Sequence, residues 1–155
     1  MCIFRKFKVL LLTVLIFLVL SFGKSALAAD IILNDLAGQP VNISSYQGKP
    51  RILFFWTTWC PYCRGELKKL NHKSSQIAEE GIFILGINVS ESDRRVKRFL
   101  EGYQLNFKML LDKIGLLADQ YDLLGVPMFI LLDKTGQVVS RGNSLPDNYK
   151  SLLFR

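Results

Sequence analysis

The chain has 155 residues and a formal net charge of +7, and half of its residues are hydrophobic. Its first 29 residues hold four of the 20 basic residues and none of the 13 acidic ones, so the remaining 126 residues carry only +3. This weak charge gives no indication of nucleic-acid binding, and a stretch of this length suits one domain.

The first 29 residues have the three parts of a secretory signal peptide. A basic start at residues 5–8 precedes an apolar run at residues 9–22, and Ala26-x-Ala28 follows as a small-residue cleavage site. The apolar run is shorter than the roughly 20 residues of a membrane span. We therefore expect cleavage after residue 28 or 29 and an exported domain of residues 30–155, in the periplasm or at the outer face of the cytoplasmic membrane. A retained membrane anchor is the alternative.

The exported part alternates strands with helices. Residues 31–46 predict an N-terminal β-hairpin, because short apolar runs there are broken by turn residues. Further strands are expected at 51–56, 82–89, 107–111, 128–132 and 137–141. Helices are expected from Pro61 to Gly81, from Ser90 to Tyr103, at 114–121 and at 146–154. A turn at 133–136 joins the last two strands. This order predicts an α/β fold with parallel strands, helical crossovers and a final antiparallel hairpin.

The helix after Ser90 has two distinct faces. Ser90 is the expected N-cap, with Asp93 three residues later. The apolar face comprises Val96, Phe99, Leu100 and Tyr103. The opposite face comprises Arg94, Arg95, Lys97 and Arg98. We expect this basic face to be solvent-exposed, and a docking surface for an acidic partner is the alternative.

Two cysteines stand where the strand at 51–56 gives way to the following helix. Pro61 suits the first helical position, so Cys60 is the expected N-cap and Cys63 lies in the first turn, within disulfide reach. A thiolate at a helix start is stabilised, so we expect a low pKa for Cys60. The chain has no second C-x-x-C pair, which disfavours a zinc ribbon. The pattern therefore predicts a redox centre at the exposed tip of the helix.

Several motifs together resemble those of the exported TlpA/ResA-like thiol–disulfide oxidoreductases, which have the thioredoxin fold. The matching segments are Phe54–Cys60, Cys63–Glu66, Ile87–Glu91, Gly125–Pro127 and Leu132–Gly136. The resemblance covers residues 30–142 and implies a thioredoxin-like fold, with a central mixed sheet flanked by helices and an N-terminal β-hairpin extension. Met128 stands where the family commonly has threonine, Pro61-Tyr62 is an inner pair that glutaredoxins use, and the C-terminal part is short.

Cys60 is the predicted attacking thiolate and Cys63 the resolving thiol. Glu66 lies three residues after Cys63 and so projects on the same helix face, and the resemblance also implies a glutamate close to the thiols. There its pKa is expected to be raised, and it could relay the Cys63 proton. The alternative is a surface glutamate that pairs with Lys69.

The remaining candidate residues would bind substrate. By resemblance, Pro127 is a cis-proline facing the cysteines, and the backbone of Val126 could pair with an extended substrate strand. Trp59 and Tyr62, with Pro61 between the cysteines, are expected to form an apolar rim, and core filling is the alternative for the two aromatic residues.

The sequence therefore predicts an exported thiol–disulfide oxidoreductase acting on protein substrates, with no cofactor besides the Cys60–Cys63 disulfide. The resemblance implies reduction, with a membrane electron donor and substrates such as apocytochrome c. A peroxiredoxin-like peroxidase is an alternative: Thr57 is in place for it, but Leu53 stands where it needs proline. A copper-delivery module is another alternative, although a third ligand is missing near the pair and His72 is expected at the surface.

Overall fold

The computed structural model describes residues 31–155, so the predicted signal peptide and its cleavage site lie outside the described residues. The elements are β1 (Ile32–Asp35), β2 (Pro40–Asn42), the 3₁₀ helix η1 (Ile43–Tyr46), β3 (Arg51–Trp56), α2 (Pro61–Glu79), β4 (Phe83–Val89), α3 (Asp93–Leu100), β5 (Lys108–Asp112), α4 (Leu116–Gln120), β6 (Met128–Leu132), β7 (Val138–Gly142) and α5 (Tyr149–Leu153). No helix within 31–155 is both long and apolar enough to span a membrane.

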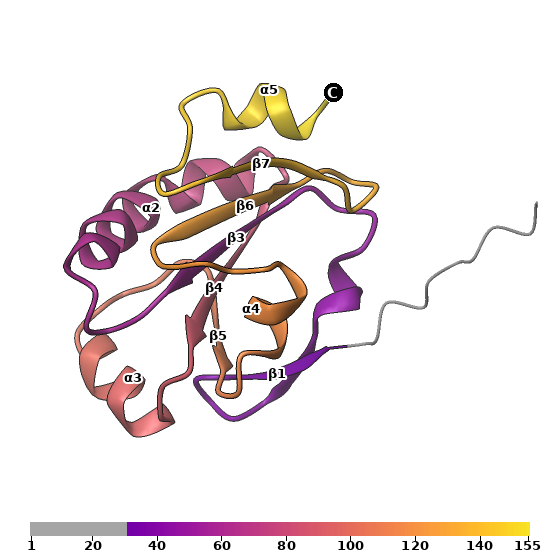
Figure 1. The fold of residues 1–155 in the computed structure, drawn as a ribbon. Helices are drawn as coiled ribbons and strands as arrows, with labels where there is room; N and C mark the ends of the chain where they lie inside the picture. Colours follow the sequence, from indigo (N-terminus) through magenta and orange to yellow (C-terminus); the bar gives the residue numbers. More distant parts are fainter. Residues whose placement is uncertain (1–30) are drawn as a thin grey trace, which may run out of the picture.

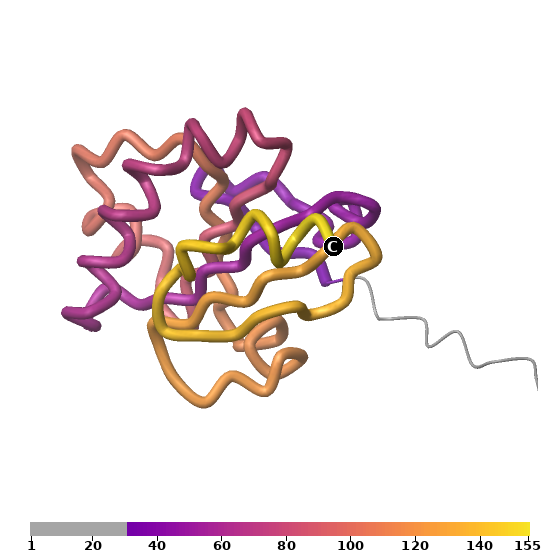
Figure 2. Tube along the Cα trace, turned by 90° about the horizontal axis from the view of Figure 1, so that it is seen from above, coloured from indigo at the N-terminus to yellow at the C-terminus, as the bar shows by residue number. Residues whose placement is uncertain are grey.

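The strands form one mixed sheet in the order β2-β1-β5-β4-β3-β6-β7. Figure 1 draws the strands as arrows, and Figure 2 traces the same chain from above. The three central strands β5, β4 and β3 are parallel, and the neighbours on both sides are antiparallel. This confirms the thioredoxin-like architecture and the N-terminal hairpin that the sequence predicts.

Side chains of β3 alternate between two hydrophobic clusters, one on each face of the sheet. Phe54 and Trp56 point into the cluster that α2, α3 and α5 cover, whereas Phe55 points into the cluster that α4 covers. Because both faces are covered, all six residues of β3 are buried, and the five residues after Arg51 form a continuous apolar run. Within residues 31–155, β3 is thus the one strand whose residues are all buried.

The predicted start of α3 is wrong. The N-cap is Ser92 rather than Ser90, and Ser90 has a positive φ of 56°. The chain turns at Ser90 because the next side chain, Glu91, is directed into the protein before the helix begins. The strands at 108–112 and 138–142 each lie one residue later than expected, the helices α4 and α5 are shorter than expected, and η1 was not expected.

Candidate active site

Cys60 and Cys63 lie at the point where β3 gives way to α2. Cys60 is the N-cap of α2, as predicted, and its Sγ accepts a hydrogen bond from the Cys63 backbone N–H at 3.2 Å. Pro61 occupies the first helical turn. The two cysteines are not bridged.

The expected exposed position of Cys60 is wrong. Cys60 is 4% exposed and Cys63 is fully buried, so only their order of exposure agrees with the prediction. The exposed groups are the neighbouring aromatic side chains, Trp59 at 63% and Tyr62 at 81%. This exposure shows that the core-filling alternative is wrong for both residues, and the apolar rim stays a prediction.

Burial raises the pKa of Cys63 from its usual value near 9 to about 12. A hydrogen bond with Cys60 and the negative charge of a Cys60 thiolate contribute to this value in the same direction, whereas the Thr57 backbone N–H lowers the pKa. At neutral pH, Cys63 of the reduced protein therefore stays protonated.

The loop before β6 closes over Cys60. Because β6 runs antiparallel to β3, with Met128 opposite Phe55, the residues that precede β6 lie beside those that follow β3. The Val126–Pro127 peptide bond is cis, as expected. The Cys60 thiol donates to the Val126 carbonyl oxygen across 3.6 Å. The structure thus brings Val126 and Pro127 to the cysteines; their role in binding substrate stays a prediction.

Glu66 lies one turn beyond Cys63 on α2, with its side chain 14% exposed. Its carboxylate accepts a hydrogen bond from Lys69 Nζ at 2.8 Å, which is the pairing of the alternative interpretation. The proton relay from Cys63 to Glu66 therefore stays a prediction.

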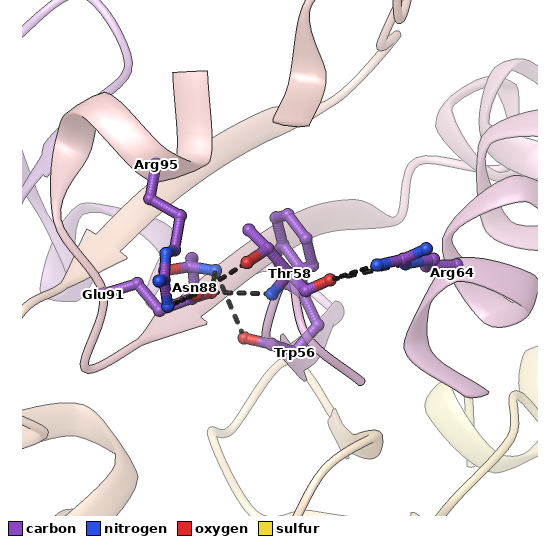
Figure 3. A network of polar contacts seen from close by, with 6 residues as sticks. All are labelled: Trp56, Thr58, Arg64, Asn88, Glu91 and Arg95. Atoms are coloured by element: carbon purple, nitrogen blue, oxygen red, sulfur yellow. Dashed lines mark hydrogen bonds and ion pairs between the residues drawn. The ribbon is translucent and has the colours of Figure 1, made fainter. Parts of the chain in front are cut away.

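A buried carboxylate that was not among the predicted site residues holds the loop before Cys60. Glu91 accepts hydrogen bonds from the Thr58 backbone N–H and hydroxyl, both at 2.6 Å, and from Asn88 Nδ2 at 2.8 Å (Figure 3). Asn88 also donates to the Trp56 carbonyl at 3.5 Å, and Arg95 lies 3.7 Å from Glu91. Figure 3 shows Glu91 on one side of Thr58 and Arg64 on the other.

Arg64 completes this support from α2. Its Nε and Nη2 donate to the Thr58 carbonyl at 3.3 and 3.1 Å. The N–H and C=O of Thr58 are thus both bound, which fixes the turn that positions Cys60. The sequence signal that could have identified Glu91 is Asn88-x-x-Glu91 at the end of β4, because neighbouring parallel strands β3 and β4 end at the same edge of the sheet.

His72 is exposed, as expected. Within residues 31–155, no group of three or more His, Cys, Asp or Glu side chains is arranged to hold a metal ion.

Comparison with known proteins identifies a family, a relative and two solved structures that this chain resembles. Residues 25–141 match the model of the AhpC/TSA family. The thiol-disulfide oxidoreductase ResA of Bacillus thuringiensis subsp. konkukian is 32% identical over 120 residues, which cover 77% of this chain and 68% of ResA.

Among solved structures, a secreted Mycobacterium tuberculosis disulfide oxidoreductase homologous to E. coli DsbE has a TM-score of 0.69 and 26% identity, covering 80% of this chain and 94% of that one. StoA from Bacillus subtilis has a TM-score of 0.69 and 23% identity, covering 82% and 98%, and supports the fold alone.

Proposed function

Because this chain belongs to the AhpC/TSA family and is a ResA-like thiol–disulfide oxidoreductase, we propose that it reduces disulfides of protein substrates outside the cytoplasm through Cys60 and Cys63. The observation that carries the proposal is the unequal environment of the two sulfurs. Cys60 receives an amide hydrogen bond beneath an exposed aromatic rim, whereas Cys63 is enclosed and keeps its proton.

In the first step, the Cys60 thiolate attacks one sulfur of the substrate disulfide. The substrate S–S bond breaks, a Cys60–substrate disulfide forms, and the departing sulfur takes a proton. The amide N–H of Cys63 and the recess under Trp59 and Tyr62 position Cys60 for this attack.

In the second step, Cys63 loses its proton and attacks Cys60 Sγ. The substrate leaves as a dithiol, and the protein keeps the Cys60–Cys63 disulfide, so two electrons pass to the substrate. The mixed disulfide removes the charge on Cys60 that helps to raise the pKa of Cys63, so the first step itself prepares the second. Glu66, on the next turn of α2, is the proposed acceptor of the proton.

The resemblance of the motifs supports the proposed direction of the reaction, and the amino-terminal sequence supports its proposed place. The basic, apolar and small-residue segments of residues 1–29 support export, and the relative from M. tuberculosis is described as secreted. We propose a membrane protein as the electron donor and apocytochrome c among the substrates, as the resemblance to the TlpA/ResA-like group implies. The oxidised pair would be the only redox group.

The AhpC/TSA match also raises the peroxidase alternative. A peroxidase of this kind needs a proline seven residues before the reactive cysteine, and that position is Leu53. Leu53 is buried in β3 and pairs with Leu85 on one side and Ile130 on the other. A proline inside a central strand removes a ladder hydrogen bond, so this position is unsuited to the proline of a peroxidase. The absence of proline at Leu53 therefore supports the thiol–disulfide reaction over the peroxidase reaction.

Cysteine substitution tests the order of attack. Cys60→Ala should abolish disulfide reduction, and Cys63→Ala should accumulate mixed disulfides with natural substrates in the extracytoplasmic fraction, detected on non-reducing gels. The double variant, which should trap nothing, is the control. Trapping by Cys60→Ala instead would reverse the two roles.

The reduction potential of the Cys60–Cys63 pair tests the direction of the reaction. A value near or below about −270 mV would agree with a reductant, and one near about −120 mV would indicate an oxidant.

A further inference from the structure

A basic groove lies directly beside the cysteines, between the loop that leads to Cys60 and helix α3. It encloses about 480 Å³. The residues that line it include four arginines and two aromatic residues, whose apolar side-chain portions form much of its surface: Arg64, Arg94, Arg95, Arg98, Trp59 and Phe99. No aspartate or glutamate is among the described residues that line it.

The positive charge of this groove is little neutralised by the protein itself. Arg64 donates to a backbone carbonyl and lies 5.4 Å from the centre of the Phe99 ring, so its hydrogen bonds involve no carboxylate. Arg95 lies 3.7 Å from Glu91, whose oxygens already accept three shorter hydrogen bonds.

The other acidic groups of this region are engaged or lie outside the groove. Asp93 pairs with Lys113 at 2.7 Å, and Glu101 follows the last residue of α3. Arg94 and Arg98 are exposed, and no carboxylate of residues 31–155 lies within 4 Å of either guanidinium. Two guanidinium groups are therefore available to an incoming anion.

The groove is continuous with the reactive centre along the chain. Trp59, which lines the groove, is the residue immediately before Cys60. A substrate cysteine that reaches Cys60 carries its neighbouring residues with it, at about 3.3–3.6 Å per residue of extended chain. Residues only a few positions from that cysteine would thus reach the arginines.

We propose that this groove binds an acidic segment of the protein substrate that flanks its reactive cysteine. The proposal rests on protein disulfides being the substrates. Guanidinium groups bind carboxylates through paired hydrogen bonds, and the aromatic walls accept the apolar stems of acidic or neighbouring side chains. The groove is thereby a specificity determinant for the disulfide reaction.

Two synthetic peptides test the proposal, each with the same internal disulfide. One has aspartate and glutamate flanking the cysteine, and the other has asparagine and glutamine at the same positions. We expect kcat/KM for the acidic peptide to exceed that for the neutral peptide by about threefold to tenfold at low salt, because exposed charge pairs contribute modestly, and to approach it at about 1 M salt.

Two charge-matched double variants locate the effect. Arg94→Gln/Arg98→Gln should bring the ratio of the two kcat/KM values close to one. Lys97→Gln/Lys134→Gln removes the same charge from exposed residues outside the groove and should keep the wild-type ratio.

Three results would overturn the proposal. The first is a ratio of one in the wild type. The second is an equal loss of the ratio in both double variants, which would indicate net charge rather than the groove. The third is an unchanged ratio in Arg94→Gln/Arg98→Gln together with lost binding to phosphatidylglycerol vesicles, which would assign the arginines to a membrane surface. Absence of turnover even with the neutral peptide would instead contradict the proposed function.

Discussion

Cys60 and Cys63 are one helical turn apart, and their surroundings rather than their spacing make them different. Cys63 faces the core between β3 and α2, which raises its pKa to about 12. Cys60 receives the N–H of Cys63 and is covered by the carbonyl of Val126, 66 residues later in the chain. In the proposed reaction, Cys63 therefore stays protonated while Cys60 attacks the substrate.

Glu66 is the residue whose role the geometry leaves most open to test. We predict that Glu66→Gln shifts the alkylation rate of the reduced pair to lower pH, because a carboxylate near two thiols disfavours a second negative charge. Turnover near neutral pH should fall by about tenfold or more if the carboxylate takes the Cys63 proton. Stability should change by less than about 1 kcal/mol, because Lys69 is exposed and glutamine keeps the shape and one hydrogen-bonding oxygen of Glu66.

The measurement is the alkylation rate against pH for the wild type and Glu66→Gln, with turnover alongside. Glu79→Gln, an exposed change at the far end of the same helix, is the control. Superimposable pH curves with equal turnover would leave Glu66 as an ordinary partner of Lys69.

At the scale of elements, the two parallel strands β3 and β4 assemble the site from separate parts of the chain. Trp56 lies opposite Asn88, so the loops that follow the two strands meet. Glu91 in one loop then binds Thr58 in the other. The turn before the cysteines is therefore held by a strand-to-helix connection, and not by its own residues alone.

We predict that Glu91→Ala lowers the free energy of unfolding by about 3 kcal/mol, because it leaves the buried Thr58 and Asn88 donors without their acceptor. Turnover should fall as well, since the turn that positions Cys60 loses its anchor. Urea denaturation and insulin reduction measure the two effects.

Glu101→Ala is the control, because Glu101 is exposed and directly follows α3. Its free energy of unfolding should remain within about 0.5 kcal/mol of the wild-type value. A Glu91→Ala variant that is also within 1 kcal/mol of the wild type would show that water replaces the carboxylate at no great cost.

The sequence was sufficient to predict the strands and helices themselves, but not the conformation of the loops at their ends. Local sequence was enough to predict the buried strand at 51–56 and the helix start at Cys60-Pro61. An apolar run and an N-cap each depend on adjacent residues. The Ser90 cap was wrong, and Glu91 was missed as a site residue, because the loop conformation there depends on Thr58, 33 residues away. The burial of Cys60 was missed for the same reason, since Val126 covers it.

At the scale of the whole molecule, the order of strands and helices was enough to predict the mixed sheet, because parallel strands need crossovers and β6 and β7 need only a short turn. The basic groove could not be predicted in this way. Arg64 and α3 meet there only because α2 and α3 cover the same face of the sheet.

Protonation of Cys63 also bears on the stability of the whole reduced protein. The folded state holds this proton up to a pKa of about 12, whereas the unfolded chain releases it near 9, so the folded state binds more protons between these values. We therefore predict that the reduced form loses stability as pH rises above about 9, by at most about 1.4 kcal/mol per pH unit from this group.

Urea denaturation of the reduced wild type and of Cys63→Ser, from pH 8 to 10.5, isolates this contribution. Burial, followed by the hydrogen bond and charge of Glu80, raises the pKa of Tyr149 to about 12 as well, but Tyr149 affects both proteins equally. Parallel stability curves for the two proteins would contradict the prediction.

The N-terminal hairpin has a consequence for how the protein behaves in concentrated solution. β1 pairs with β5 through Asn34 and Asp35, and Asp35 also lies 3.6 Å from Lys108. Without this hairpin, β5 would become an open edge with unpaired N–H and C=O groups, which is a template for aggregation. The outermost strands as they stand are poor templates: β2 has three residues and begins with Pro40, and the pairing of β7 with β6 is interrupted by a bulge at Leu131/Leu132. A shortened protein that starts after residue 42 would thus keep its cysteines and still be expected to aggregate.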